Sequence, residues 1–195
     1  LAIVIEHCYH EHSYFLTGLA IYPQEPLTGD DIHISCKTRR KDLSARWYKD
    51  DFQITNITEY KDKEQEQEHT LTIQKAKMSD SGVYCIQVKG RKRQIHLNVE
   101  DYFSNGLTIR PKEPIEGNDI SISCKVKKVN ISADWYRNGK RVKETNRIKI
   151  NEQDQEHTLT IYKARPIDSD RYCIEIKGVK KEIQLEVEAF NCFNG

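Results

Sequence analysis

Apolar and polar residues alternate along several short stretches of the chain. The segment 32–36 reads Ile-His-Ile-Ser-Cys, and the segment 120–124 reads Ile-Ser-Ile-Ser-Cys. A period of two is typical of a strand with one buried face. No stretch carries a sustained helical period. The other predicted strands are 45–48 and 133–136, 69–73 and 157–161, 84–88 paired with 95–99, and 172–176 paired with 183–187.

Turn-forming residues separate these predicted strands. Asn138-Gly139 is a strong signal for a two-residue hairpin, and Asp50-Asp51 and Lys89-Gly90 occupy similar places. About seven or eight short strands, with a turn every 8 to 12 residues, predict an all-β sandwich.

The pattern occurs twice at a constant offset. A shift of 88 residues places Trp47 on Trp135 and Cys85 on Cys173, and about half the positions between Leu19 and Glu100 are identical to their counterparts. A repeat of this length is a duplicated domain. We predict two tandem β-sandwiches joined by a short linker, with residues 1–13 as an N-terminal junction, 14–100 and 101–188 as the domains, and 189–195 as the start of a further junction.

Two short motifs resemble a known superfamily. Residues 80–84 read Asp-Ser-Gly-Val-Tyr and 168–172 read Asp-Ser-Asp-Arg-Tyr, which resemble the Asp-x-Gly-x-Tyr signature of immunoglobulin domains. The resemblance implies that each Tyr bonds back to the backbone near the start of its strand. The second motif has Asp170 in place of Gly, which should cost little if that position is not at positive φ.

The cysteines depart from the secreted form of this fold. That form places its second Cys two residues after the corner Tyr, whereas Cys85 and Cys173 follow one residue after it. Because side chains alternate along a strand, we predict that these thiols face away from the core and that Ile86 and Ile174 face into it. A Cys36–Cys85 bridge would then need a bulge.

Sandwiches without this bridge fit a reducing cytosol. The chain resembles the intermediate-set (I-set) domains of the intracellular muscle proteins titin, twitchin, obscurin and myosin-binding protein C, through segments such as 135–140 (Trp-Tyr-Arg-Asn-Gly-Lys) and 157–161 (His-Thr-Leu-Thr-Ile). The predicted structural core comprises Cys36, Trp47, Tyr84, Ile86, Cys124, Trp135, Tyr172 and Ile174. Cys85 and Cys173 are the predicted surface thiols.

Composition narrows the possible functions. The chain has 195 residues, of which 31% are charged, with 31 basic against 30 acidic residues. A nucleic-acid binder would normally carry a basic excess. No apolar run approaches the roughly 18 residues that span a bilayer. Because no catalytic triad, phosphate loop or paired carboxylates stand out, we expect no enzymatic activity and no cofactor.

The two ends and the joint resemble junctions within a longer array. Glu100 and Asp101 alone separate Val99 from Tyr102 and Phe103, which suggests a short, semi-rigid joint. The cluster His7, Cys8, His10, Glu11 and His12 has metal-binding chemistry. It has no matching second pair other than the distant Cys192, so we interpret it as a solvated junction.

Three surface features carry weaker signals. The basic segments 89–93 and 177–181 could bind an acidic partner, although exposed charges on a hairpin usually serve solubility and edge protection. The acidic runs 64–68 and 152–156 read as solvated turns. Asn56 and Asn130 lie in glycosylation sequons, which would matter only in an extracellular protein.

Two functions remain open. The leading one is a structural and protein-interaction module of a tandem array in a cytoskeletal, sarcomeric protein of the cytoplasm. It would space and bear load through hydrogen bonds between terminal strands near Ile21 and Leu97, and bind neighbouring domains or filament components. The alternative is the ectodomain of an adhesion molecule or receptor that binds a protein ligand, because this fold hosts both.

Overall fold

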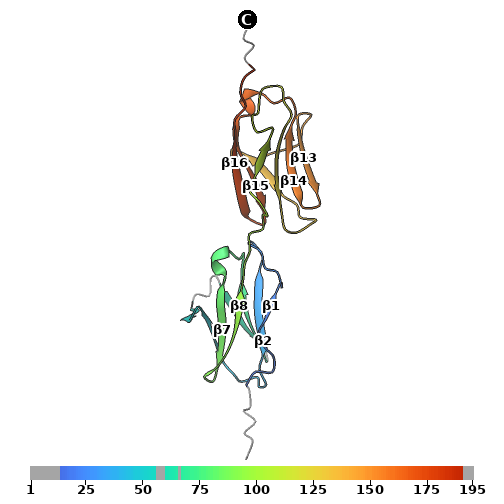
Figure 1. Ribbon diagram of the computed structural model, residues 1–195. Helices are drawn as coiled ribbons and strands as arrows, with labels where there is room; N and C mark the ends of the chain where they lie inside the picture. The colour runs from blue at the N-terminus through green and yellow to red at the C-terminus, as the bar shows by residue number, and fades with distance from the viewer. Residues whose placement is uncertain (1–13, 56–59, 66, 191–195) are drawn as a thin grey trace, which may run out of the picture. The chain divides into compact units, whose positions relative to one another are not determined.

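The computed structural model describes residues 14–55, 60–65 and 67–190, with the backbone alone for 60–65. The chain divides into two compact units (Figure 1). The first, called here the first sandwich, contains residues up to Pro26 together with Asp30–Val99. The second sandwich contains Leu27–Gly29 and everything from Glu100 onward. Each described unit is built almost entirely of antiparallel strands.

The first sandwich consists of two four-stranded sheets. Its strands in sheet order are β1 (Ala20–Tyr22), β2 (Ile32–Lys37), β6 (Glu68–Ile73) and β5 (Tyr60–Gln65) in one sheet, and β4 (Phe52–Gln53), β3 (Ala45–Lys49), β7 (Gly82–Val88) and β8 (Arg91–Leu97) in the other.

The second sandwich repeats this topology. Its strands in sheet order are β13 (Ile148–Gln153), β14 (Glu156–Ile161), β10 (Ile120–Lys125) and β9 (Thr108–Arg110) in one sheet, and β12 (Lys140–Arg141), β11 (Asp134–Arg137), β15 (Asp170–Ile176) and β16 (Val179–Leu185) in the other. Figure 1 shows β13 and β14 on one side of this unit and β15 and β16 on the other.

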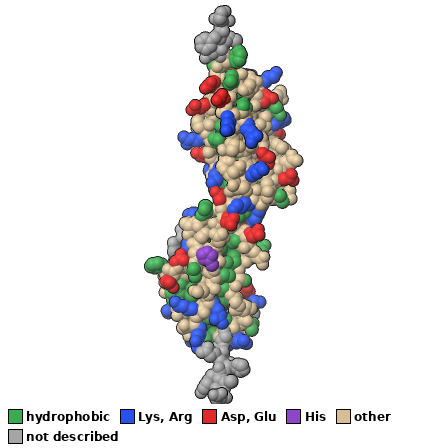
Figure 2. Space-filling model, viewed as in Figure 1, with side chains coloured by type: hydrophobic (Ala, Val, Ile, Leu, Met, Phe, Trp, Pro, Cys, Tyr) green, Lys and Arg blue, Asp and Glu red, His purple; other side chains and the backbone are tan. Residues whose placement is uncertain are grey.

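The alternating segments form strands with one buried face. In β2 the exposure alternates residue by residue, and Ile32 and Ile34 are fully buried. Acidic and basic side chains are interspersed over the visible outer surface of both units (Figure 2). The alternation therefore separates an apolar interior from a charged exterior within each sandwich.

The β7–β8 hairpin begins earlier than the sequence predicts. Val88 pairs with Arg91 across the Lys89-Gly90 turn, so β8 starts at Arg91 and not at Ile95. The charged run 91–93 is therefore part of the strand. A two-residue hairpin turn of type I′ has positive φ at both positions, and Lys89 and Gly90 have φ values of 48° and 80°.

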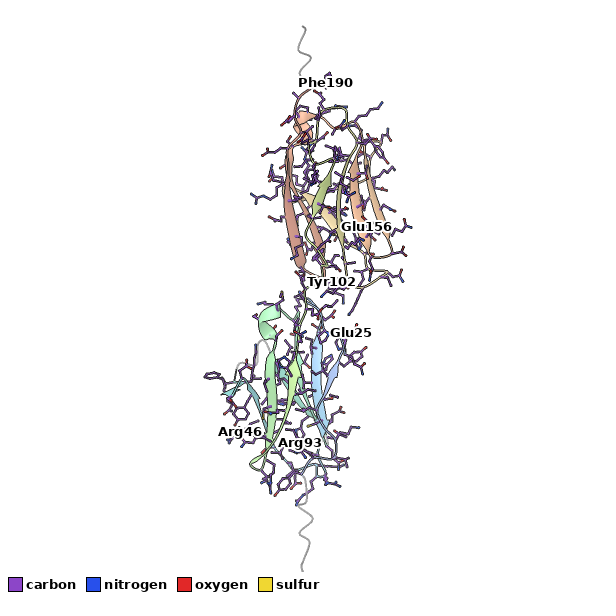
Figure 3. The ribbon with its side chains drawn as sticks, viewed as in Figure 1. Glu25, Arg46, Arg93, Tyr102, Glu156 and Phe190 are labelled. Atoms are coloured by element: carbon purple, nitrogen blue, oxygen red, sulfur yellow. The ribbon has the colours of Figure 1, made fainter. Side chains whose placement is uncertain are left out.

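Each sandwich encloses its own apolar core. Side chains along the ribbon are drawn in Figure 3. The two cores have equivalent members, including Trp47 in the first and Trp135 in the second, which are 3% and 1% exposed. Tyr102 and Phe103 at the joint belong to the second core, where Phe103 pairs with Val126.

A tyrosine closes one end of each core. The Tyr84 hydroxyl donates to the Asp80 carbonyl at 2.8 Å, and the Tyr172 hydroxyl donates to the Asp168 carbonyl at 3.0 Å. Both carbonyls lie in short 3-10 turns, η1 (Met78–Asp80) and η2 (Pro166–Asp168). This is the bond that the superfamily resemblance implies.

The Gly-to-Asp difference between the two Tyr motifs has a local cause. Gly82 has a φ of 154°, and a β-carbon there would lie 2.6 Å from Asp50 Oδ2. Asp170 is not among the residues at positive φ, and Asn138 occupies the position equivalent to Asp50. The second sandwich therefore accepts a side chain where the first cannot.

The terminal pairing differs from expectation. Ile21 pairs with Ile34 in β2, and Leu97 pairs with Gly82 in β7, so these two neighbourhoods do not bond to each other. The pairing of entering and leaving segments occurs instead through parallel bridges, Leu27 with Glu100 and Ile115 with Glu188.

Candidate interaction surfaces

The eight predicted core residues occupy equivalent places in the two sandwiches. All are buried, and all belong to the hydrophobic cluster of their own unit. Trp47 pairs with Ile86 across β3 and β7, and Trp135 pairs with Ile174 across β11 and β15. These residues support the sheets from inside and leave the opposite faces for contact with other molecules.

The prediction that Cys85 and Cys173 are exposed is wrong. Only 7% and 8% of their surfaces are exposed, although neither belongs to a core cluster. Tyr48 and Gln94 are the direct cross-strand neighbours of Cys85. A small side chain between two larger ones is covered even on the outer face of a sheet. The equivalent neighbours flank Cys173.

Burial keeps the thiols protonated. It raises the pKa of Cys36 to about 11 and that of Cys124 to about 12, and the nearby carboxylates of Glu68 and Glu156 act in the same direction. Burial also raises the pKa values of Cys85 and Cys173. All four are free thiols. Because the thiolate, and not the thiol, acts as nucleophile or metal ligand, these protonated side chains should react slowly at neutral pH.

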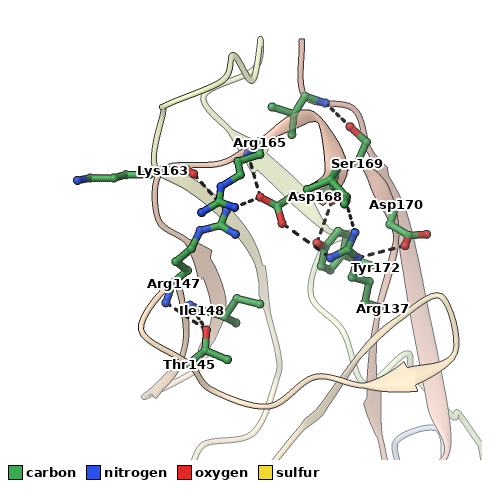
Figure 4. A network of polar contacts seen from close by, with 12 residues as sticks. Arg137, Thr145, Arg147, Ile148, Lys163, Arg165, Asp168, Ser169, Asp170 and Tyr172 are labelled. Carbon is green, nitrogen blue, oxygen red and sulfur yellow. Dashed lines mark hydrogen bonds and ion pairs between the residues drawn. The ribbon is translucent and has the colours of Figure 1, made fainter. Parts of the chain in front are cut away.

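A network of charged groups fastens one end of the second sandwich (Figure 4). The Asp168 carboxylate is buried and forms ion pairs with Arg147 and Arg137. It also accepts a hydrogen bond from the backbone N–H of Arg165 at 2.9 Å. Arg137 additionally contacts Asp170 at 3.1 Å and lies over the Tyr172 ring. The first sandwich has Lys49 in place of Arg137, and its Nζ donates to the Ser79 carbonyl.

Two buried histidines were missed as functional candidates. His69 and His157 are each 2% exposed, at the start of the Leu-containing segments of β6 and β14. The period of two in the sequence already placed both histidines on the same side of their strands as the buried Leu and Ile. The Thr38 hydroxyl lies 3.3 Å from His69 Nε2. Burial lowers the pKa of His157, although the Glu152 carboxylate 3.7 Å away opposes that shift.

On the outer face of the sheet that contains β3, β7 and β8, and on its counterpart in the second sandwich, a lysine ammonium lies over a tyrosine ring. The Lys92 ammonium lies over the Tyr48 ring, 5.4 Å from its centroid. Lys180 lies over Tyr136 in the same way at 5.6 Å. In each case the covered thiol lies beside the tyrosine. These outer faces thus carry aromatic and cationic groups together.

The remaining sequence candidates are spread over the surface or lie outside the described residues. The basic segment 177–181 includes Lys181, whose Nζ contacts Asp101 at 2.7 Å. Asn130 is exposed, with a φ of 57°. Asn56, the cluster His7, Cys8, His10, Glu11 and His12, and Cys192 lie outside the described residues.

The described residues contain neither a membrane-spanning helix nor a cluster of metal ligands. No helix in them is long and apolar enough to cross a membrane. Nor do three His, Cys, Asp or Glu side chains within residues 14–55 and 67–190 come together as a group that could hold a metal ion.

Comparison with known proteins finds similarity along both repeats. Chicken fast-type myosin-binding protein C is 25% identical over 175 residues, which cover 85% of this chain and 16% of that protein. Mouse cardiac-type myosin-binding protein C is 24% identical over 155 residues, covering 78% of the chain and 12% of that protein. The chain thus spans well under a fifth of these relatives.

A solved structure shows the same fold. The I9–I11 tandem of titin matches with a TM-score of 0.62 and 20% identity, covering 88% of this chain and 66% of the titin fragment. The family model of the immunoglobulin I-set domain matches residues 19–100 and again 106–188. The chain therefore belongs to the immunoglobulin I-set family and carries two of its domains in tandem.

Proposed function

We propose that this chain is a structural and protein-binding segment of a tandem immunoglobulin array in a cytoskeletal, sarcomeric protein. The observation that carries the proposal is the similarity to myosin-binding protein C through both domains in succession, over 85% of the chain. A match that includes the joint favours a shared array over a shared single module. In this role the domains space their neighbours, bear tension and bind other proteins.

The terminal pairing suits a load-bearing role. The backbone N–H of Glu116 donates to the Glu188 carbonyl at 2.8 Å, and the N–H of Glu188 donates to the Pro114 carbonyl at 2.9 Å. These segments run parallel. Tension applied to the two ends of the domain pulls parallel strands past each other, so the bonds between them share the force.

The first sequence repeat has the same arrangement, although its two paired segments, Leu27–Gly29 and Glu100, lie in the second compact unit. Leu27 pairs in parallel with Glu100, and the backbone N–H of Thr28 donates to the Glu100 carbonyl at 2.8 Å. Leu27 and Thr28 correspond to Ile115 and Glu116, and Glu100 corresponds to Glu188. A bond pattern kept in both repeats is expected if both carry the same load.

The location of the protein tests the cytoskeletal assignment. We expect the complete chain, tagged with a fluorescent protein and expressed in striated muscle cells, to form regular transverse bands that coincide with a sarcomeric marker. A tag of the same size alone should remain diffuse. A diffuse distribution of the tagged chain would contradict the proposal.

The exposed sequon at Asn130 favours the ectodomain as a second candidate. That role predicts an N-glycan at Asn130 in the protein purified from its natural source, with a mass loss after treatment with peptide N-glycosidase. The cytoskeletal role predicts no change in mass, because cytosolic proteins do not meet the glycosylation machinery.

A further inference from the structure

The outer faces of two equivalent sheets differ in charge, although their backbones and central tyrosines correspond. We call the outward side of β3, β7 and β8 the first outer face; its chemistry lies in Arg46, Tyr48, Gln87, Lys92 and Gln94. The outward side of β11, β12, β15 and β16 is the second outer face. Arg46 is labelled on the first sandwich in Figure 3.

The acidic and basic side chains of the second outer face form ion pairs with one another. Its carboxylates, Asp134, Glu175 and Glu182, each have a cationic partner on the same face. Asp134 pairs with Arg141, Glu175 lies 3.3 Å from Lys180, and Glu182 lies 3.8 Å from Arg171. Every charge among these six side chains is thus matched by an opposite charge, and the face presents little net field to a partner.

The first outer face lacks all three carboxylates. Arg46 replaces Asp134, Gln87 replaces Glu175 and Gln94 replaces Glu182. The lysine remains, because Lys92 is equivalent to Lys180. Within the described part of the chain, Arg46 and Lys92 therefore have Gln87, and no carboxylate, directly across from them.

The two cations flank one row of the sheet. Arg46 pairs with Gln87, and Gln87 pairs with Lys92, so the cations lie on either side of a neutral amide. Two strand spacings separate their backbones by about 10 Å. No ion pair joins either cation to the side chains that the structure describes. One carboxylate, Asp51 at the β3–β4 turn, lies close enough to influence the Cys85 thiol.

A fixed aromatic ring lies beside this row. The Tyr48 hydroxyl donates to Gln87 Oε1 at 2.8 Å, and the Lys92 ammonium lies over the ring. A tyrosine held from two sides loses little conformational entropy when a partner covers it. Tyrosine and arginine are also the residues that most often dominate binding energy at protein interfaces.

We infer that the first outer face binds an acidic protein segment, whose carboxylates pair with Arg46 and Lys92 while its chain covers Tyr48. A protein fits better than nucleic acid or an anionic membrane, because those surfaces require a large basic patch and this chain carries a net charge of only +1. The inference rests on the proposed role as a protein-binding module and names the partner chemistry for one face.

The repeat itself supplies the test variants. Changing Arg46→Asp, Gln87→Glu and Gln94→Glu gives the first face the acidic residues of the second. The reciprocal set Asp134→Arg, Glu175→Gln and Glu182→Gln removes them from the second face. Each substitution uses a residue that the other repeat accepts at the same backbone position, so both variants should fold, which a thermal melt checks.

The probe is a twelve-residue oligoglutamate peptide, titrated into the isotope-labelled complete chain and followed by amide chemical shifts. We expect shifts at residues 46, 48, 87, 92 and 94 and none at their equivalents in the second domain. The first variant should weaken binding about fivefold or more, and the reciprocal variant should create a new site. Binding should weaken as salt is raised.

Several results would overturn the inference. Equal shifts on both faces, or no change with the first variant, would show that the charge difference does not select the acidic peptide. Tighter binding to phosphatidylserine vesicles or to a single-stranded RNA dodecamer at the same salt would assign the face to a different partner. Banding in muscle cells is independent of these readings, so the face can fail while the array function stands.

Discussion

Buried polar side chains differ between the two domains even where the backbones correspond. His69 has Thr38 beside its ring, whereas the equivalent neighbour of His157 is Val126. The Glu152 carboxylate lies 3.7 Å from His157 Nδ1. Thr38 and Val126 therefore give the two buried imidazoles different surroundings on equivalent backbones.

The burial of His157 should make the stability of the second domain depend on pH. Burial lowers the pKa of His157, so the unfolded chain binds more protons than the folded one as pH falls below 6.5. The free energy of unfolding of the second domain should therefore decrease as the pH is lowered from above 6.5 through the lowered pKa of the folded state. Urea unfolding followed by Trp135 fluorescence, in a Trp47→Phe background, measures it. His157→Gln should flatten this dependence; an unchanged slope would show that His157 does not cause it.

The four described thiols should be protected from alkylation because they are buried in the folded chain, and not because they are oxidised to disulfides. With the pKa of Cys36 raised to about 11 and that of Cys124 to about 12, thiolate is scarce at pH 8. Alkylation with iodoacetamide at pH 8, mapped by mass spectrometry, should be slow for Cys36, Cys85, Cys124 and Cys173 in the folded chain and fast in denaturant. Recovery of linked Cys36–Cys85 peptides would contradict the free-thiol state and the cytosolic assignment together.

Strands and turns show where sequence reasoning succeeds and where it stops. The alternation at 32–36 and 120–124 predicts β2 and β10 correctly, because one face of each is buried. The start of β8 was missed, since Arg91, Lys92 and Arg93 conceal the period of two. Cross-strand covering of Cys85 depends on which residues pair with it, and one strand alone does not contain that information. The charge difference between the outer faces likewise appears only once the register is known.

The β3–β4 turn contains a strain that its counterpart avoids. Asp50 and Asp51 have φ values of 48° and 67°, whereas the equivalent turn has Asn138 followed by Gly139. Positive φ costs a non-glycine residue roughly 1 kcal/mol. Asp51→Gly should therefore stabilise the first domain by about 1 kcal/mol, and Gly139→Asp should destabilise the second by a similar amount. Chemical denaturation of the two variants measures both. A loss of stability with Asp51→Gly would mean that the Asp51 side chain makes a stabilising contact that outweighs the strain.

At the scale of the whole molecule, each of the two sequence repeats has its own core and its own parallel terminal pairing. In the proposed function each domain is a link of an array, and such a link must resist tension on its own. The bonds that should resist this tension are those between Glu188 and the segment Pro114–Glu116 and their equivalents at Glu100.

Pulling single copies of the 195-residue chain between inert handle domains measures how strongly these bonds resist force. We expect two separate unfolding steps, each releasing about 30 nm of chain as roughly 85 residues extend. Glu188→Pro removes the N–H that donates to Pro114 and should lower the force of one step only. Glu186→Pro, at an exposed position, is the matched control. Extension in a single step, or unfolding forces that Glu188→Pro leaves unchanged, would rule out a load-bearing role for these bonds.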